Sequence, residues 1–153
     1  MSMIALGKLR WRGIPEFMAF FFPKVYTRID WAAGYSFLDK ELQQVVRDAE
    51  LGRRYVDKLV EVRLIDGDES WVCVHVEVQG EAENAFARRM FTYHYRLFDR
   101  FGKPLASLAV LADDRPSWRP EGYGYELFGC RIQFDFPAVK LLDMQDDLDS
   151  LLE

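Results

Sequence analysis

The spacing of apolar residues predicts two helices in the first third of the chain. Residues 15–22 form a short apolar stretch that begins with a proline and is followed by another, as in a single buried helix. Residues 37–51 repeat apolar side chains on one side of a helix, with Ser36 as the expected N-cap and Gly52 as the expected stop. A short buried helix and a longer amphipathic one are therefore expected.

Between residues 55 and 79 the hydrophobic period changes from helical to alternating. The segment 66–69, Asp-Gly-Asp-Glu, separates two strand-like runs, which is typical of a β-hairpin. In the second run valines alternate with a chemically richer set, and the two faces carry Val72, Val74, Val76 and Val78 against Trp71, Cys73, His75, Glu77 and Gln79. Since both faces contain apolar bulk, we expect a central strand with a layer packed on each side.

The second half of the chain alternates helical and strand patterns. The expected order is a long helix over 81–101, a strand over 105–111, a turn-rich stretch over 113–124, a strand over 125–136 and an acidic C-terminal helix over 137–153. A helix between strands favours an α/β fold with a mixed central β-sheet flanked by helices on both faces. We expect a single domain over residues 1–153, because the sequence contains neither repeats nor linkers.

Composition and charge narrow the class of protein. The 153 residues are 50% hydrophobic and 29% charged, which excludes a disordered chain. The net charge of −5 argues against a general polyanion binder. However, residues 137–153 hold one basic and five acidic groups, so the rest of the chain is close to neutral and a nucleic-acid substrate stays open.

The two cysteines and the first apolar run indicate the cellular compartment of the protein. Cys73 and Cys130 lie in apolar runs without a second ligand pair, so we expect reduced core thiols rather than a disulfide framework or a zinc site. The most apolar early run, 17–22, is far shorter than the ~20 residues that span a bilayer. It also lacks the small residues that follow a signal peptide. We expect a cytoplasmic protein without a membrane partner.

Asp57, Glu77 and Gln79 are the residues best placed for chemistry. If a three-residue loop over 66–68 closes the hairpin, Asp57 pairs directly with Glu77, and their Cβ atoms would be about 4.5–5.5 Å apart. Two carboxylates at that distance repel unless a cation lies between them, and Mg²⁺ prefers oxygen ligands of this kind. The alternative is that both are solvated surface residues, although Glu77 lies in an apolar run where an unpaired carboxylate is costly.

These residues carry a resemblance to a known family. Asp57, then Glu77-Val78-Gln79 on an apolar strand, then Arg89 and Tyr93 in the next helix resemble the PD-(D/E)XK nuclease superfamily. The chain most resembles the PD-(D/E)XK nuclease family transposase, or recombination-promoting nuclease, group, over about residues 15–142. The resemblance implies a restriction-endonuclease-like core and a metal-dependent bacterial DNA endonuclease.

The same resemblance implies a role for each residue at the site. Asp57, Glu77 and the backbone carbonyl of Val78 would bind Mg²⁺ or Mn²⁺, with Glu41 as a further acidic ligand. The chain departs from the usual pattern with Gln79, which stands where the superfamily has lysine, and with Val56, which stands where it has proline. A glutamine orients water but carries no positive charge, so phosphate stabilisation would rest on the metal and on Arg89. The alternative is a catalytically weak or inactive nuclease-fold module that binds nucleic acid or a protein partner.

Three further features have two interpretations each. His75, on the face of Glu77, is either a base beside the metal ligands or a buried polar residue. The loop 115–120 is either a nucleic-acid or partner contact, or a rigid loop whose Trp118 covers the core. The leucine-spaced tail packs on the body or on a second copy in a homodimer.

Overall fold

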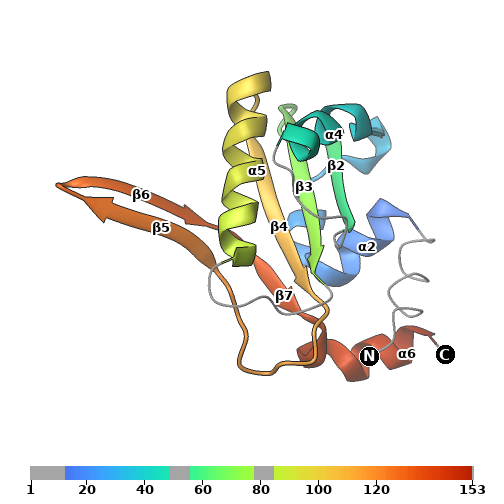
Figure 1. Ribbon diagram of the computed structural model, residues 1–153. Helices are drawn as coiled ribbons and strands as arrows, with labels where there is room; N and C mark the ends of the chain where they lie inside the picture. The colour runs from blue at the N-terminus through green and yellow to red at the C-terminus, as the bar shows by residue number, and fades with distance from the viewer. Residues whose placement is uncertain (1–12, 49–55, 78–84, 153) are drawn as a thin grey trace.

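The computed structural model describes residues 13–48, 56–77 and 85–152 (Figure 1). The helices are α2 (Ile14–Phe21), α3 (Pro23–Tyr26), η1 (Trp31–Ala33), α4 (Asp39–Asp48), α5 (Ala85–Phe101), η2 (Leu141–Met144) and α6 (Gln145–Leu152). The strands are β1 (Tyr35–Phe37), β2 (Val56–Arg63), β3 (Glu69–Glu77), β4 (Leu105–Leu111), β5 (Gly122–Leu127), β6 (Cys130–Asp135) and β7 (Ala138–Lys140). No helix within these ranges is long and apolar enough to cross a membrane.

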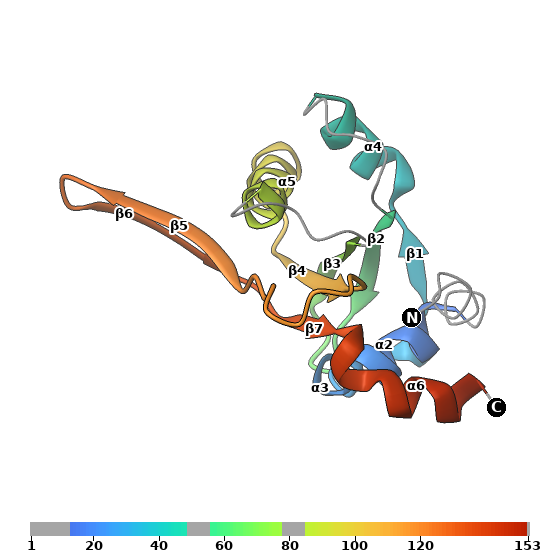
Figure 2. The same cartoon turned by 60° about the horizontal axis from the view of Figure 1, so that its bottom comes forward.

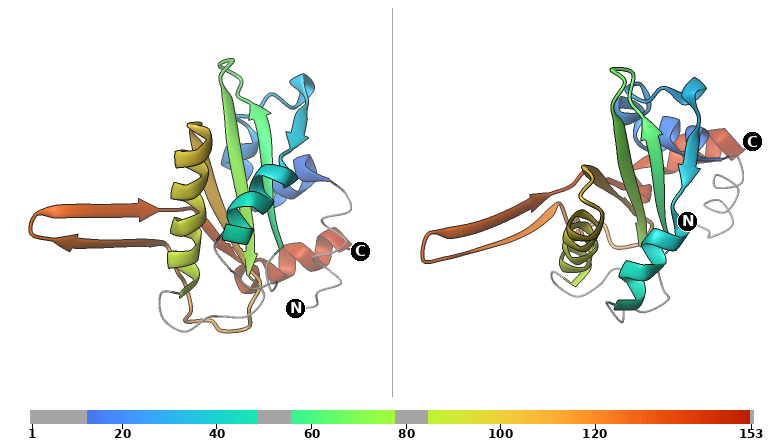
Figure 3. Two further views of the ribbon diagram at one scale, coloured as in Figure 1. Left: turned by 45° about the horizontal axis from the view of Figure 1, so that its top comes forward. Right: turned by 90° about the horizontal axis from the view of Figure 1, so that it is seen from above.

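Five strands form a mixed central sheet in the order β1-β2-β3-β4-β7. The first three are antiparallel neighbours, whereas β3, β4 and β7 are parallel. Helix α5 connects β3 to β4 and lies with α4 on one face, while α2 and α6 lie on the other (Figures 2 and 3). The predicted α/β class, with helices on both faces of a mixed sheet, is confirmed.

Strand β3 is buried on both faces, as its alternating pattern predicts. Its valines face a core shared with α2, which contains Phe17, Met18, Phe21, Val72, Val74 and Val76. The opposite face packs against α4 and α5 in a second core, which contains Leu42, Val45, Leu59, Trp71, Cys73, Tyr93 and Leu97. The more polar face of β3 is therefore covered by α5, and any site on that face lies between sheet and helix.

The β2–β3 hairpin turns one residue earlier than predicted. The Leu64 amide donates to the Asp68 carbonyl at 2.8 Å, which makes residues 65–67 the loop, and Gly67 adopts a φ of 99°. Asp57 consequently pairs with His75, so the predicted pairing with Glu77 is wrong. The shift is two residues, an even number, and Asp57, His75 and Glu77 therefore still share one face of the sheet.

The segment before α4 differs from the predicted long helix. Residues 35–37 form edge strand β1, in which Phe37 pairs with Val60, and the helix begins only at Asp39. Ser36 is thus a strand residue, not an N-cap, because pairing with β2 satisfies its backbone. The expected stop at Gly52 lies outside the described residues.

The C-terminal part also corrects the sequence prediction. The single strand expected over 125–136 is a two-stranded ribbon, β5–β6, whose two-residue turn is Phe128-Gly129 with φ values of 54° and 81°. The acidic helix expected from 137 begins at Leu141, because residues 138–140 form β7 beside β4. The ribbon projects away from the sheet, beyond α5 (Figures 1 and 3).

The two cysteines have different surroundings. Both are free, and Cys73 is buried as predicted. Cys130 is exposed because it begins β6 next to the ribbon turn, so the prediction of a core thiol is wrong there.

The close pairing of β5 with β6 depends on glycine at position 124. A Cβ built on Gly124 would lie 2.5 Å from the Ile132 carbonyl oxygen, so Gly124→Ala must push the two strands apart. We expect a local cost of about 1–3 kcal/mol, seen as faster amide hydrogen exchange in residues 122–135. Glu126→Ala, two residues along on the same face of the ribbon, is the matched control and should leave exchange unchanged. Equal exchange in both variants would contradict this steric account.

Candidate functional site

Asp57 and His75 form the centre of the candidate site, on the sheet face under α5. They lie directly opposite each other on β2 and β3, with 3.4 Å between the Asp57 Oδ1 and the His75 Nδ1. The Asp57 side chain is only 7% exposed and that of His75 is fully buried. Histidine 75 is therefore a buried polar residue that directly contacts the candidate metal ligand.

The charge state of His75 follows from its neighbours. Burial alone lowers the pKa of the imidazole, but charge interactions and hydrogen bonds with the Cys73 and Asp57 side chains outweigh it and raise the pKa to about 10. A cationic ring at this position pairs with the Asp57 carboxylate in a site that is nearly closed to water.

Helix α5 places Tyr93 and Arg89 over the same face. The Tyr93 ring lies 5.6 Å from the His75 ring, centroid to centroid. Because α5 joins two parallel strands, it runs antiparallel to β3, and Arg89 lies one turn from Tyr93 toward the end of β3. Four helical residues rise about 6 Å, close to the two-residue advance from His75 to Glu77. Arg89 thus lies level with Glu77 along the sheet.

Burial separates Arg89 from the exposed arginines of α5. Its side chain is 4% exposed, and its Cζ lies 5.0 Å from the centroid of the Phe86 ring. Arg88, one residue earlier, is exposed. Of these two cations, Arg89 is therefore the one that the helix turns toward the candidate site.

Glu77 ends β3, where it pairs with Leu111 of parallel strand β4. Its backbone position is diagonal to Asp57, and diagonal neighbours in a sheet are about 7–8 Å apart. That separation leaves more room for a bridging cation than the direct pairing predicted from sequence. The Glu77 side chain, Val78 and Gln79 lie outside the described residues.

The Asp57 carboxylate fits a metal ligand in one respect. Its Oδ1 is buried and accepts no hydrogen bond from the described residues, but the His75 Nδ1 lies within ion-pair distance of the same oxygen at 3.4 Å, so a metal ion at this oxygen would replace that contact. Within the described ranges, no three His, Cys, Asp or Glu side chains gather around one point. Glu41, half-buried in the first turn of α4, belongs to no such group of described side chains, and the predicted ligand set of Asp57, Glu77, Val78 and Glu41 includes residues outside the described part.

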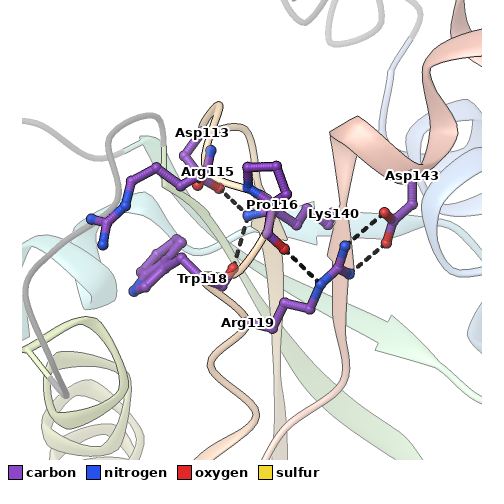
Figure 4. A network of polar contacts seen from close by, with 7 residues as sticks. All are labelled: Asp113, Arg115, Pro116, Trp118, Arg119, Lys140 and Asp143. Atoms are coloured by element: carbon purple, nitrogen blue, oxygen red, sulfur yellow. Dashed lines mark hydrogen bonds and ion pairs between the residues drawn. The ribbon is translucent and has the colours of Figure 1, made fainter.

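Lys140 does not take the place of the lysine that the PD-(D/E)XK superfamily has where this chain has Gln79. Lys140 and Glu77 lie at the same end of the parallel strands. Lys140 pairs with Leu111, which pairs with Glu77, so it lies two strands from Glu77, about 9–10 Å away. Its Nζ is occupied by the Asp113 Oδ1 at 2.7 Å and the Trp118 carbonyl at 2.8 Å (Figure 4). The role of Lys140 is to fix the 113–121 loop.

The loop around Trp118 packs on the core through its tryptophan side chain. The indole ring is buried and lies 5.6 Å from the Phe86 ring, in a third cluster with Met90 and Phe136. Arg119 makes a bidentate ion pair with Asp143 at 2.6 and 2.8 Å, which ties the loop to η2 (Figure 4). The prediction that Trp118 covers the core is confirmed.

The tail packs on the body where it is described. Leu141 is buried in the valine-lined core and Met144 packs against it. The side chains of Leu148, Leu151 and Leu152 lie outside the described residues. The tail is thus part of the fold at its start.

Sequence reasoning missed the direct contact between His75 and Asp57. The alternation in β3 puts His75 on the face that carries the candidate site. Which residue of β3 lies opposite Asp57, however, depends on where the hairpin turns, and the predicted turn is one residue too late. No family model, curated protein or solved structure matches the chain.

Proposed function

We propose that this chain is a metal-dependent DNA endonuclease of the PD-(D/E)XK type, from the transposase or recombination-promoting nuclease group. The observation that carries the proposal is a nearly buried carboxylate, Asp57, with an oxygen that accepts no hydrogen bond from the described residues, diagonal to Glu77 at the end of a central strand. A structural surface carboxylate would instead be hydrated.

The order of elements supports a restriction-endonuclease-like core. A hairpin carries both carboxylates, the crossover helix α5 follows it, and β4 returns parallel to the second hairpin strand. Asp57, Glu77 and Arg89 thereby come to one face from three successive elements.

Each residue has a defined task in this proposal. Asp57, Glu77 and the Val78 carbonyl hold Mg²⁺ or Mn²⁺, which when bound polarises the phosphodiester and acidifies water. Gln79 orients the attacking water through its amide. Arg89 donates charge-assisted hydrogen bonds to the scissile phosphate and offsets the missing lysine. His75 holds the Asp57 carboxylate in place through the contact at 3.4 Å.

We also place the protein in the cytoplasm. Both of its cysteines are free, including the exposed Cys130, as is usual in a reducing compartment. Bacterial DNA is accessible in the same compartment.

Plasmid nicking tests the proposal. The wild-type chain should convert supercoiled plasmid to open circles with Mg²⁺ or Mn²⁺ and stop when EDTA is added. Glu77→Gln should lose this activity, whereas Glu69→Gln, an exposed carboxylate on the same strand, should retain it. Equal nicking by wild type and Glu77→Gln would contradict the assignment. DNA binding without cleavage by the wild type would favour an inactive module.

A further inference from the structure

The β5–β6 ribbon has one apolar and one polar face. Its register places Tyr123 opposite Phe134, Tyr125 opposite Ile132 and Leu127 opposite Cys130 on one side, with Gly122 opposite Asp135, Gly124 opposite Gln133 and Glu126 opposite Arg131 on the other. Two-stranded ribbons are marginally stable in water by themselves. An apolar face that runs the whole length of this ribbon therefore needs a covering surface.

The inner end of the apolar face is covered by α5. The Phe91 ring stacks on Tyr123 with centroids 5.2 Å apart and lies 5.9 Å from the Phe134 ring. His94 adds a ring contact to Phe134 at 4.7 Å. These contacts anchor the base of the ribbon, and the views agree that its outer end extends beyond the body (Figures 1, 2 and 3).

The outer end and the neighbouring stripe of α5 are exposed. Tyr95 and Phe98 follow Phe91 on one side of the helix at steps of four and three residues, and the Tyr95 ring lies 5.3 Å from that of Phe91. The large exposed apolar residues of the helix and ribbon are Tyr95 (45%), Phe98 (56%), Tyr125 (55%), Leu127 (58%) and Phe128 (98%). These five side chains are called the outer apolar surface below.

We propose that the outer apolar surface binds the same surface of a second copy of the chain in a two-fold dimer. The five side chains expose roughly 600 Å² together, taking about 200 Å² for each when fully exposed. When two copies bury the surface reciprocally, the total reaches roughly 1,200 Å², where stable interfaces begin.

The geometry suits an isologous contact. The helix stripe and the ribbon face meet at Phe91, so each copy offers both a projecting arm and a helix for the partner's arm to cover. A two-fold axis uses both surfaces in both copies and closes the assembly. Duplex DNA is a poor occupant, because the apolar face of the ribbon carries no lysine or arginine for phosphate.

The mass in solution tests the dimer directly. Light scattering on a gel-filtration column should give twice the chain mass of 18.0 kDa for the wild type. Tyr125→Thr with Leu127→Thr keeps strand-forming residues while removing apolar area, and should give monomers. Phe98→Gln, on the helix, should also weaken the dimer. Gln133→Thr, on the polar face of the same ribbon, is the matched control and should remain dimeric.

Cross-linking tests the arrangement independently of stability. Cys130 lies four residues beyond Phe134, about 13 Å along the strand from the α5 contact, too far for a disulfide within one chain to position 95. Tyr95→Cys should therefore form a disulfide-linked dimer under mild oxidation. Adding Cys130→Ser should abolish that band.

Three results would overturn the proposal. The first is a wild type that is monomeric at all concentrations. The second is a dimer that both the ribbon and the helix substitutions leave intact, since its interface would lie elsewhere. The third is a monomer whose duplex DNA binding is lost with the ribbon substitutions, which would make the ribbon a nucleic-acid arm.

Discussion

Asp57→Asn is expected to abolish metal binding and to lower the nicking rate by at least about 10³-fold, because metal ions supply several kcal/mol of transition-state stabilisation. Asparagine keeps the shape of the side chain but loses the charge that holds a divalent ion. In the wild type, Mn²⁺ should raise the thermal unfolding midpoint, since a ligand that binds only the folded state stabilises it. In Asp57→Asn that rise should disappear.

The control for this prediction lies in the same hairpin. Asp68→Asn changes an exposed carboxylate next to the turn and should retain both the Mn²⁺-induced shift and the nicking rate. Asp57→Asn also places a neutral side chain beside His75, which can lower the stability of the fold by itself. Comparing the unfolding midpoints of the same variant with and without Mn²⁺ removes this effect from the result. An undiminished shift in Asp57→Asn would show that the ion binds at another place.

Lys140→Met is expected to destabilise the fold by about 3–5 kcal/mol, because it leaves the Asp113 carboxylate buried without its cation. Both side chains of this ion pair are 1% exposed, and the lysine also donates to the Trp118 carbonyl. Urea unfolding followed by tryptophan fluorescence measures the change in the free energy of unfolding.

Two variants make the stability test specific. Arg119→Gln breaks the neighbouring ion pair to Asp143, whose side chains are about half exposed, and should cost far less stability than Lys140→Met because water screens the two charges. Adding Asp113→Asn to Lys140→Met should recover part of the loss, since asparagine still accepts from the Arg115 amide without a buried charge. Equal costs for Lys140→Met and Arg119→Gln would contradict the argument from burial.

The strands with a strong pattern were predictable from sequence. Strand β4 has the predicted bounds, 105–111, because a short continuous apolar run has few other stable placements in a soluble fold. The alternating valines of β3 likewise predicted both of its covered faces. In each case the strand is buried on both faces, so every residue of the strand contributes to the hydrophobic pattern.

Strands that form only because they pair with other strands have weaker patterns in the sequence. Phe128-Gly129 is not one of the favoured hairpin pairs, because a bulky residue seldom adopts positive φ, so the ribbon was read as one strand. Strands β1 and β7 have three residues each, and their pairing with β2 and β4 distinguishes them from helix ends. Such short segments depend on partners far along the chain.

The sequence predicts which face of the sheet carries the candidate site, but not which residue lies directly beside Asp57. The parity of the hairpin placed Asp57 on the face of Glu77, and the family resemblance, through Arg89 followed by Tyr93, singled out Arg89. The partner of Asp57 depended on one residue in the turn, where Asp66-Gly67-Asp68 permits two three-residue loops. The loop at 65–67 makes His75, not Glu77, the direct neighbour of Asp57.

The position of the ribbon in the chain makes it a separable unit. Strands β4 and β7, which precede and follow it, are neighbours in the sheet, and the Phe136 amide donates to the Glu121 carbonyl at 3.0 Å across its base. The chain thus leaves and re-enters the body at one point. The part of the ribbon beyond Tyr123 and Phe134, which makes the contacts to α5, can therefore change in length without altering the order of the strands in the sheet.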